Sequence, residues 1–200
     1  MELQDKKNLY KVRQTILEMI QDRGFTIPSI ENISFEEFII KYNNKNINIY
    51  INDEEKNKNF YVYFHSESKS FGKGDLGIIQ KIINQYNDPE IAFFLILKDK
   101  ENSAVSKELA KDAYKNVEIF LKKSLIFNIT HHVYVPKHEL LSKEDEVRLL
   151  ETYNTTKGKL PKISKSDPIA KYYGMKNDQI CKIIRKSPEV GEYVYYRLVR

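Results

Sequence analysis

The chain has 200 residues, of which 41% are hydrophobic and 30% charged, and its formal net charge is +5. That length fits one large domain or two small ones with packed cores. The single cysteine, Cys181, excludes an intramolecular disulfide and a cysteine-based zinc cluster. The apolar runs are too short to cross a bilayer, and the opening residues MELQDKKNLYKVRQ contain no apolar signal core, so we expect an intracellular protein with no membrane segment.

The first predicted elements are two helices. Apolar residues recur at helical spacing between Leu9 and Ile20, which predicts an amphipathic helix over 5–22. Gly24 is expected to form the C-terminal cap of this helix. Ser34 and Glu37 have the spacing of a capping box, which predicts a short helix over 35–42.

Strand and helix signals then alternate up to residue 129. Alternating Ile47, Ile49 and Ile51 predict a half-buried strand, and Tyr61 and Tyr63 indicate another. We expect Asp75 to cap a helix that runs to Tyr86 and ends before Asn87-Asp88-Pro89, with Leu76, Ile79, Ile82 and Ile83 pointing inward.

The next signals complete an α/β layer. The wholly apolar run 91–97 is typical of a buried central strand. Ser103 is expected to cap a helix over 104–115, and 117–121 and 125–129 to form strands. Residues 1–132 are therefore predicted to form an α/β domain, a mixed sheet flanked by helices.

The pattern changes after His132, so we place a small α+β domain at 133–200. Ser142 and Asp145 predict the start of a helix to about Tyr153, with Val147, Leu149 and Leu150 as its apolar contacts. Asp167-Pro168 predicts a second helix, which is short because Gly174 follows. Residues 179–185 and 193–199 are predicted as strands, joined by a turn through Pro188 and Gly191.

The net positive charge lies entirely in the C-terminal third. Residues 134–200 contain 14 Lys and Arg and 9 Asp and Glu, whereas residues 1–133 contain 19 of each. Such an excess fits either a solvated surface or one that meets an acidic protein or nucleic acid.

Two patterns could carry chemistry, and we interpret both as structural. Gly72-x-Gly74-x-x-Gly77 matches a dinucleotide-binding fingerprint, but the polar stretch before it is not a tight strand-to-loop turn, so we expect a surface loop. His131, His132 and His138 cluster in sequence, but adjacent strand residues point to opposite faces, so we expect packing rather than metal binding. The central strand carries no acid-x-Lys pair and no nucleophile elbow is visible, so we predict no active site and no cofactor on this chain.

Five motifs between Thr130 and Leu198 carry a family resemblance. They are Thr130-His131-His132, Val135-Pro136-Lys137-His138, Leu160-Pro161-Lys162-Ile163, Ser166-Asp167-Pro168 and Tyr195-Tyr196-Arg197-Leu198, and a weaker match lies at 18–25. Together they resemble the fifth subunit shared by eukaryotic nuclear RNA polymerases, whose C-terminal module is similar to its archaeal counterpart.

The resemblance implies a non-catalytic polymerase subunit in two parts. The C-terminal domain is expected to dock on the largest subunit, and the N-terminal domain to form part of the jaw near downstream duplex DNA, with no homo-oligomer. Asn102, Ser103, Ala104 and Lys107 align with a loop that lies close to DNA in the family, although Asn102 replaces the usual proline. As partner-binding candidates we name Lys162, Lys165, Lys171, Tyr172, Tyr173, Arg185, Tyr195, Tyr196 and Arg197.

The sequence leaves alternatives open for the cellular location and the functional class of the protein. A host enzyme implies the nucleus, and a viral version implies a cytoplasmic factory or virion. The other functional classes are a free-standing DNA-binding or transcription-regulating protein and a nucleotide-binding protein that uses the Gly72–Gly77 loop.

Overall fold

The computed structural model describes residues 3–54, 56, 58–65, 70–187 and 191–200. The chain divides into two compact units, residues 1–127 and 128–200. The sequence placed this division slightly later, between 132 and 133. Among the described residues, no helix has both the length and the apolar character that a membrane span requires.

A four-stranded mixed sheet forms the centre of the N-terminal unit. Its order is β1 (Ile49–Asp53), β2 (Lys58–Phe64), β3 (Ala92–Leu97) and β4 (Val117–Leu121). β1 is antiparallel to β2, while β2, β3 and β4 run parallel. β3 is central and almost wholly buried, as its apolar run predicts.

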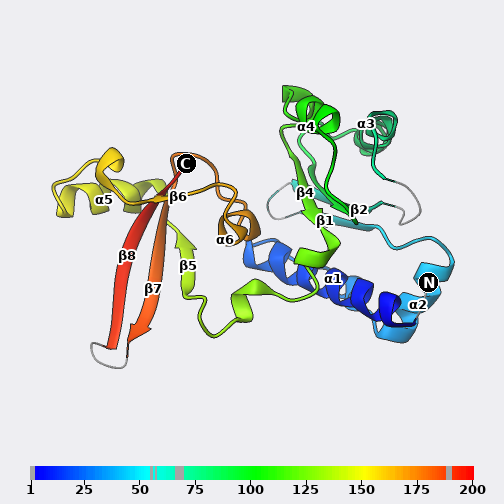
Figure 1. The fold of residues 1–200 in the computed structure, drawn as a ribbon, viewed down its shortest axis with the longest axis horizontal. Helices are drawn as coiled ribbons and strands as arrows, with labels where there is room; N and C mark the ends of the chain where they lie inside the picture. The colour runs from blue at the N-terminus through cyan, green and yellow to red at the C-terminus, as the bar shows by residue number, and fades with distance from the viewer. Residues whose placement is uncertain (1–2, 55, 57, 66–69, 188–190) are drawn as a thin grey trace. The chain divides into compact units, whose positions relative to one another are not determined.

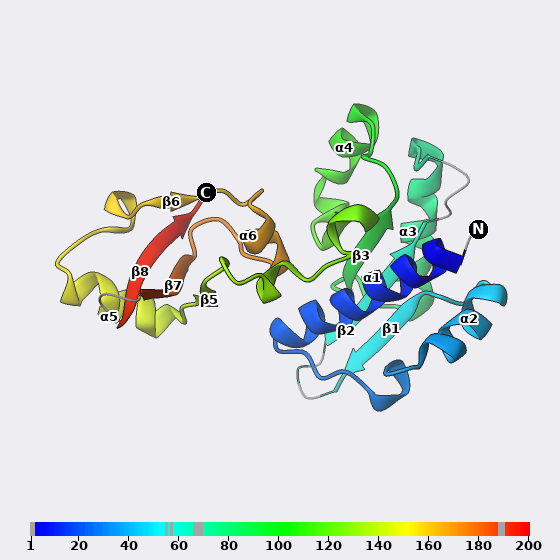
Figure 2. The ribbon, with the colours of Figure 1, turned by 60° about the horizontal axis from the view of Figure 1, so that its bottom comes forward.

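Helices cover both faces of this sheet (Figures 1 and 2). α3 (Leu76–Tyr86) and α4 (Ser103–Leu109) pack on the face that carries Phe93, Leu95 and Leu97. The long α1 (Leu3–Asp22) crosses the other side, where the Arg23 guanidinium lies 4.8 Å from the centre of the Phe94 ring.

The predicted end of the first helix and the predicted start of the second are confirmed. α1 is followed by Gly24 at φ +84°, a left-handed conformation in which glycine has no side-chain penalty. α2 (Phe35–Asn43) begins with the expected capping box, in which Ser34 Oγ accepts from the Glu37 amide and Glu37 accepts from the Ser34 amide.

Two caps differ from the prediction. Asp75 precedes α3 but does not cap it, because its carboxylate accepts from the Gly72 amide at 2.8 Å instead. α4 is capped by Asn102, whose side chain accepts from the Val105 amide at 2.9 Å, so Ser103 is the first helical residue rather than the cap.

The predicted helix 104–115 is too long. α4 ends at Leu109, and a 3-10 turn follows at Asp112–Tyr114. Val105, Leu109 and Tyr114 all pack on the same core cluster. In a continuous helix Tyr114 would lie well off the face that carries the other two, so the break returns its ring to the core.

The predicted strand 125–129 is wrong. Residues 125–128 lie between two 3-10 turns, Lys122–Ser124 and Ile129–His131, and Ile129 belongs to the second turn. Asn128 Oδ1 accepts from both the amide and the hydroxyl of Thr130, at 2.9 and 2.7 Å. Such local side-chain bonds compete with strand pairing.

The C-terminal unit is built on a second mixed sheet. Its order is β5 (Lys137–Leu140), β7 (Ile180–Ser187), β8 (Gly191–Val199) and β6 (Lys162–Ile163), antiparallel except for β6 beside β8. α5 (Lys143–Thr152) supplies Leu149 to a cluster with Ile180 and Leu198 on one face. α6 (Pro168–Tyr172) supplies Ala170 to a second cluster, with Cys181 and Val199.

The two helix starts and the long hairpin are confirmed here. Ser142 and Asp167 cap α5 and α6 through their side chains. β7 and β8 pair along their length, and Gly191 has φ +77°, while Pro188 lies outside the described residues. β5 and β6 had no counterpart in the prediction. Of the predicted apolar contacts on α5, Val147 is wrong, because its side chain is 55% exposed.

Candidate interaction surfaces

The four predicted DNA-proximal residues lie together at α4. Asn102, Ser103 and Ala104 are exposed at its first turn, and Lys107 is exposed on the same helix. Because the Asn102 side chain caps the helix, its oxygen is already used within the loop. The surface therefore offers exposed Ser103 and one positive charge to a partner.

The nine predicted partner-binding residues do not form one surface. Three lysines, Lys162, Lys165 and Lys171, are exposed near β6 and α6. Arg197 is half-buried beside them and donates to the Lys162 carbonyl oxygen at 3.2 Å. Arg185 and Tyr195 lie instead on the β7–β8 hairpin.

Three of the predicted tyrosines belong mainly to the core. Tyr172 is only 3% exposed, and its hydroxyl accepts from Asn128 Nδ2 at 3.0 Å, so its ring is not available to a partner. Tyr173 is half-buried on the α6 cluster, and Tyr196 on the α5 cluster. An aromatic residue beside a lysine is thus not sufficient to identify contact surface.

The hairpin of β7 and β8 extends beyond both helices of its unit (Figure 1). At the far end of β8, Tyr193 and Val194 are 39% and 42% exposed. Adjacent strand residues point to opposite faces, so this end of the hairpin is open on both faces. We call residues 184–187 and 191–195 the hairpin arm.

Side-chain contacts connect the two strands of the hairpin arm. The Tyr193 and Tyr195 rings stack with centroids 6.1 Å apart, and Arg185 Nη1 lies 3.5 Å from the Tyr193 hydroxyl. Sequence reasoning included Arg185 and Tyr195 but missed Tyr193 and Val194. The sequence did contain a signal for these two residues. The predicted strand pair is longer than the short predicted helices that could cover it.

The histidines do not converge. His131 and His132 are exposed, whereas His138 is buried with Nδ1 at 2.7 Å from the Pro136 carbonyl oxygen. Burial lowers the pKa of His138, against the opposing effect of that backbone bond. Over the described part of the chain, no group of His, Cys, Asp or Glu is arranged to hold a metal ion.

Cys181 is also a core residue. It is fully buried, and burial raises the pKa of its thiol to about 11. The thiolate needed for nucleophilic or redox chemistry is therefore scarce at neutral pH.

The three glycines at 72, 74 and 77 do not have the geometry of a phosphate-binding loop. A side chain added at Gly74 or Gly77 would meet nothing within 4 Å, so neither glycine is required by close packing. Gly77 lies within the first turn of α3 rather than in a loop before it. Residues 66–69, part of the polar stretch before the pattern, lie outside the described residues.

Comparisons with known proteins match both units. Residues 4–82 match the family model described as RNA polymerase Rpb5, N-terminal domain, and residues 127–199 match RNA polymerase Rpb5, C-terminal domain. The start of the second match coincides closely with the start of the C-terminal unit.

Relatives match over nearly the whole chain. The chain is 30% identical to DNA-directed RNA polymerases I, II and III subunit rpabc1 of Dictyostelium discoideum, covering 98% of this chain and 99% of that one. It is 30% identical to the subunit RPABC1 of Caenorhabditis elegans, covering 96% and 95%. It is also 30% identical to DNA-directed RNA polymerase subunit 5-like protein 1 of Arabidopsis thaliana, covering 94% of each.

Proposed function

Because the chain belongs to the Rpb5 family and is a non-catalytic subunit of a DNA-directed RNA polymerase, we propose a division of labour between its two units. The C-terminal unit docks on the largest polymerase subunit. The N-terminal unit lies beside downstream duplex DNA, with the loop before α4 facing it.

The observation that carries the docking proposal is the hairpin arm. Exposed Tyr193 and Val194 lie on its two faces, with Arg185 beside Tyr193. Tyr and Arg are enriched where protein interfaces have their strongest contacts, and Tyr193 and Val194 expose apolar surface on both faces of one strand. A partner that encloses the arm would bury both faces at once.

The DNA proposal has a smaller physical basis. Lys107 supplies one positive charge at α4, and residues 1–133 are electrically neutral as a whole. Affinity for DNA comes mainly from phosphate neutralisation, so this contact is weak by itself. It operates when the docked C-terminal unit holds the N-terminal unit beside the duplex.

Affinity purification tests the assignment to a polymerase. A tagged chain expressed in its native cells should recover the two large polymerase subunits in stoichiometric amounts. Recovery without any other polymerase chain would instead identify a free-standing DNA-binding or regulatory protein.

Fractionation of the same cells tests location. The relatives from Dictyostelium and Caenorhabditis are subunits of polymerases I, II and III of eukaryotes, so we propose a nuclear protein. Recovery from cytoplasmic factories or virions would identify a viral enzyme instead.

A further inference from the structure

The charge of the C-terminal unit is strongly polarised. Residues 157–182 and 196–200 together contain nine Lys and Arg but only two Asp and Glu. The remainder of 128–200 contains five Lys and Arg and seven Asp and Glu. The basic excess of the whole chain therefore comes from these two segments.

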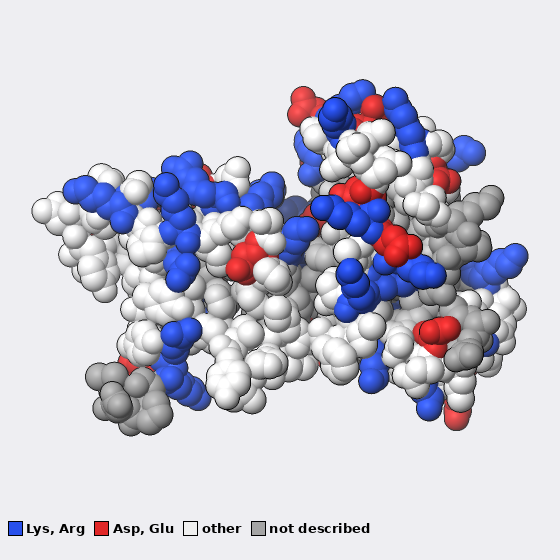
Figure 3. Space-filling model, in the orientation of Figure 1, with Lys and Arg blue, Asp and Glu red and all other residues white. Residues whose placement is uncertain are grey.

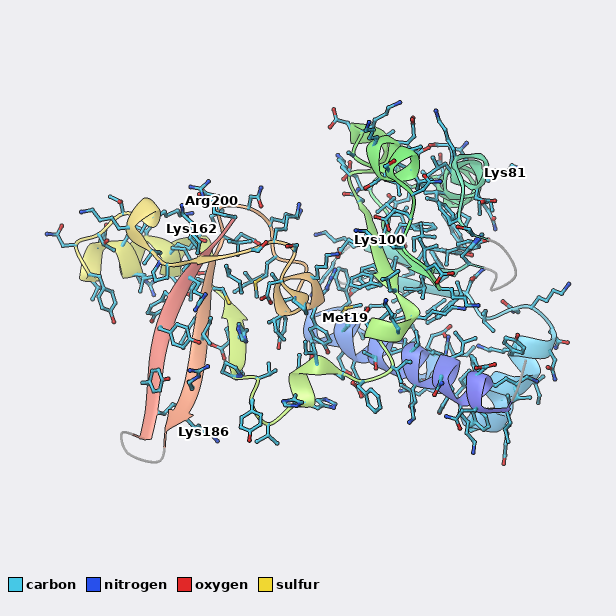
Figure 4. The ribbon with its side chains drawn as sticks, viewed as in Figure 1. Met19, Lys81, Lys100, Lys162, Lys186 and Arg200 are labelled. Atoms are coloured by element: carbon cyan, nitrogen blue, oxygen red, sulfur yellow. The ribbon has the colours of Figure 1, made fainter. Side chains whose placement is uncertain are left out.

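Backbone bonds bring the two segments together at one end of the sheet. β6 pairs with the end of β8, the Lys165 amide donates to the Arg200 carbonyl at 2.7 Å, and the Asp178 amide donates to the Val199 carbonyl at 3.0 Å. In Figure 4, Lys162 and Arg200 lie close together there, and Lys186 lies at the opposite end of the hairpin. We call this end, with its exposed cations Lys159, Lys162, Lys165, Lys176 and Arg200, the basic end.

Neighbouring acids do not neutralise the basic end. Of the two acidic side chains in these segments, Asp167 accepts from the Ile169 amide at 2.8 Å, and Asp178 pairs at 3.4 Å with Lys157, which is not one of the five exposed cations. Within the part of the chain that the structure describes, none of the five exposed cations forms an ion pair. Figure 3 shows Lys and Arg gathered along this edge of the unit.

The basic end has the wrong chemistry for a protein interface. Lysine is depleted at such interfaces, which gather aromatic and apolar residues instead. Among the described residues, the exposed large hydrophobic side chains of this unit are Val133, Tyr134, Leu140, Val147, Tyr153, Tyr193 and Val194, and none of them belongs to residues 157–182 or 196–200. Closely spaced lysines without exposed apolar neighbours fit a phosphate backbone.

Duplex nucleic acid fits better than a single strand. Single strands are held by exposed aromatic rings on which the bases stack. The aromatic residues of the two basic segments are covered: Tyr172 is buried, and Tyr173 and Tyr196 are half-buried against the core clusters. We propose that the basic end binds the phosphate backbone of duplex DNA, as a second nucleic-acid contact distinct from the loop before α4.

Charge removal in the full-length chain tests this proposal. The test variant combines Lys159→Gln, Lys162→Gln, Lys165→Gln and Lys176→Gln, four of the exposed cations that define the basic end. The matched control, Lys7→Gln, Lys45→Gln, Lys81→Gln and Lys143→Gln, removes the same charge from exposed positions outside both the basic end and the hairpin arm. Fluorescence anisotropy measures binding to a duplex of about 30 base pairs over a salt series, with circular dichroism confirming that each variant is folded.

We expect the test variant to weaken duplex binding by about tenfold or more and to reduce the salt slope by about three to four. The control should shift affinity by about twofold or less, and a single strand of the same sequence should bind the wild-type chain more weakly than the duplex. Equal losses in the two variants would overturn the proposal, because they would reflect net charge alone. A test variant that keeps duplex binding but no longer co-purifies with other polymerase subunits would assign the basic end to a protein partner and also overturn it.

Discussion

At the scale of single residues, the most informative position in the C-terminal unit is the buried acid Glu146. Its carboxylate accepts from the Ile180 amide at 2.9 Å and from Lys157 Nζ at 2.7 Å. It thereby joins α5, the first residue of β7 and the turn at Lys157–Lys159. A helical pattern that searches for apolar positions misses this residue and selects Val147 in its place.

We expect Glu146→Ala to lower the unfolding free energy of the C-terminal unit by about 2 kcal/mol, because it leaves the buried Ile180 amide without an acceptor. Urea denaturation followed by circular dichroism, with hydrogen exchange at Ile180, measures the loss. Glu144→Ala, on the exposed face of the same helix, should cost about 0.5 kcal/mol or less. Equal losses of stability in the two variants would mean that the buried hydrogen bonds of Glu146 do not stabilise the unit.

His138 should make the stability of the same unit depend on pH. Burial lowers the pKa of His138 in the folded state. Below about pH 6.5, His138 is therefore protonated to a greater extent in the unfolded chain than in the folded chain. Stability therefore falls as the pH is lowered from 7 toward 5. His138→Gln should flatten this part of the stability curve, whereas His131→Gln, at an exposed position, should leave it unchanged. Parallel curves for wild type and His138→Gln would contradict the assignment.

At the scale of elements, the hairpin arm separates folding from docking. Tyr193 and Val194 lie beyond the two core clusters, so replacing both with serine should leave the melting temperature of the unit nearly unchanged. Recovery of the large polymerase subunits should fall by about tenfold or more, because buried aromatic anchors carry much of the energy of an interface. The matched control is Val147→Ser with Tyr153→Ser, two exposed residues at α5. Loss of the subunits in the control alone would move the docking surface to α5.

Helices and strands differ in how well the sequence predicts them. Helix starts at Ser34, Ser142 and Asp167 were predictable because a cap is a local bond between neighbours. The short strands β5 and β6 were not, because they exist only through pairing with β7 and β8, which are distant in sequence. The same limit applies to the candidate sites: residue type suggested Tyr172 for contact, and only the packing of α6 shows that it is buried.

At the scale of the whole molecule, charge and chemistry divide the surface three ways. The N-terminal unit is neutral overall, the hairpin arm exposes Tyr193 and Val194, and the basic end is rich in lysine. A chain that must stay in an assembly while touching DNA benefits from this separation, because salt weakens phosphate contacts but not apolar ones. Raising the salt should therefore release DNA before it releases the subunit.

The division of labour between the units gives the last prediction. Lys107 lies on α4 in the N-terminal unit, whereas the proposed anchor lies in the other unit. We expect Lys107→Glu to reduce crosslinking of this subunit to downstream DNA by several fold, since it replaces an attraction to phosphate with a repulsion. Assembly should remain normal, as judged by the stoichiometry of the purified enzyme. Lys81→Glu, an equal charge change at an exposed position on α3, is the control and should leave crosslinking near the wild-type level. If Lys107→Glu prevents assembly instead, the N-terminal unit is part of the anchor and the proposed division between the units is wrong.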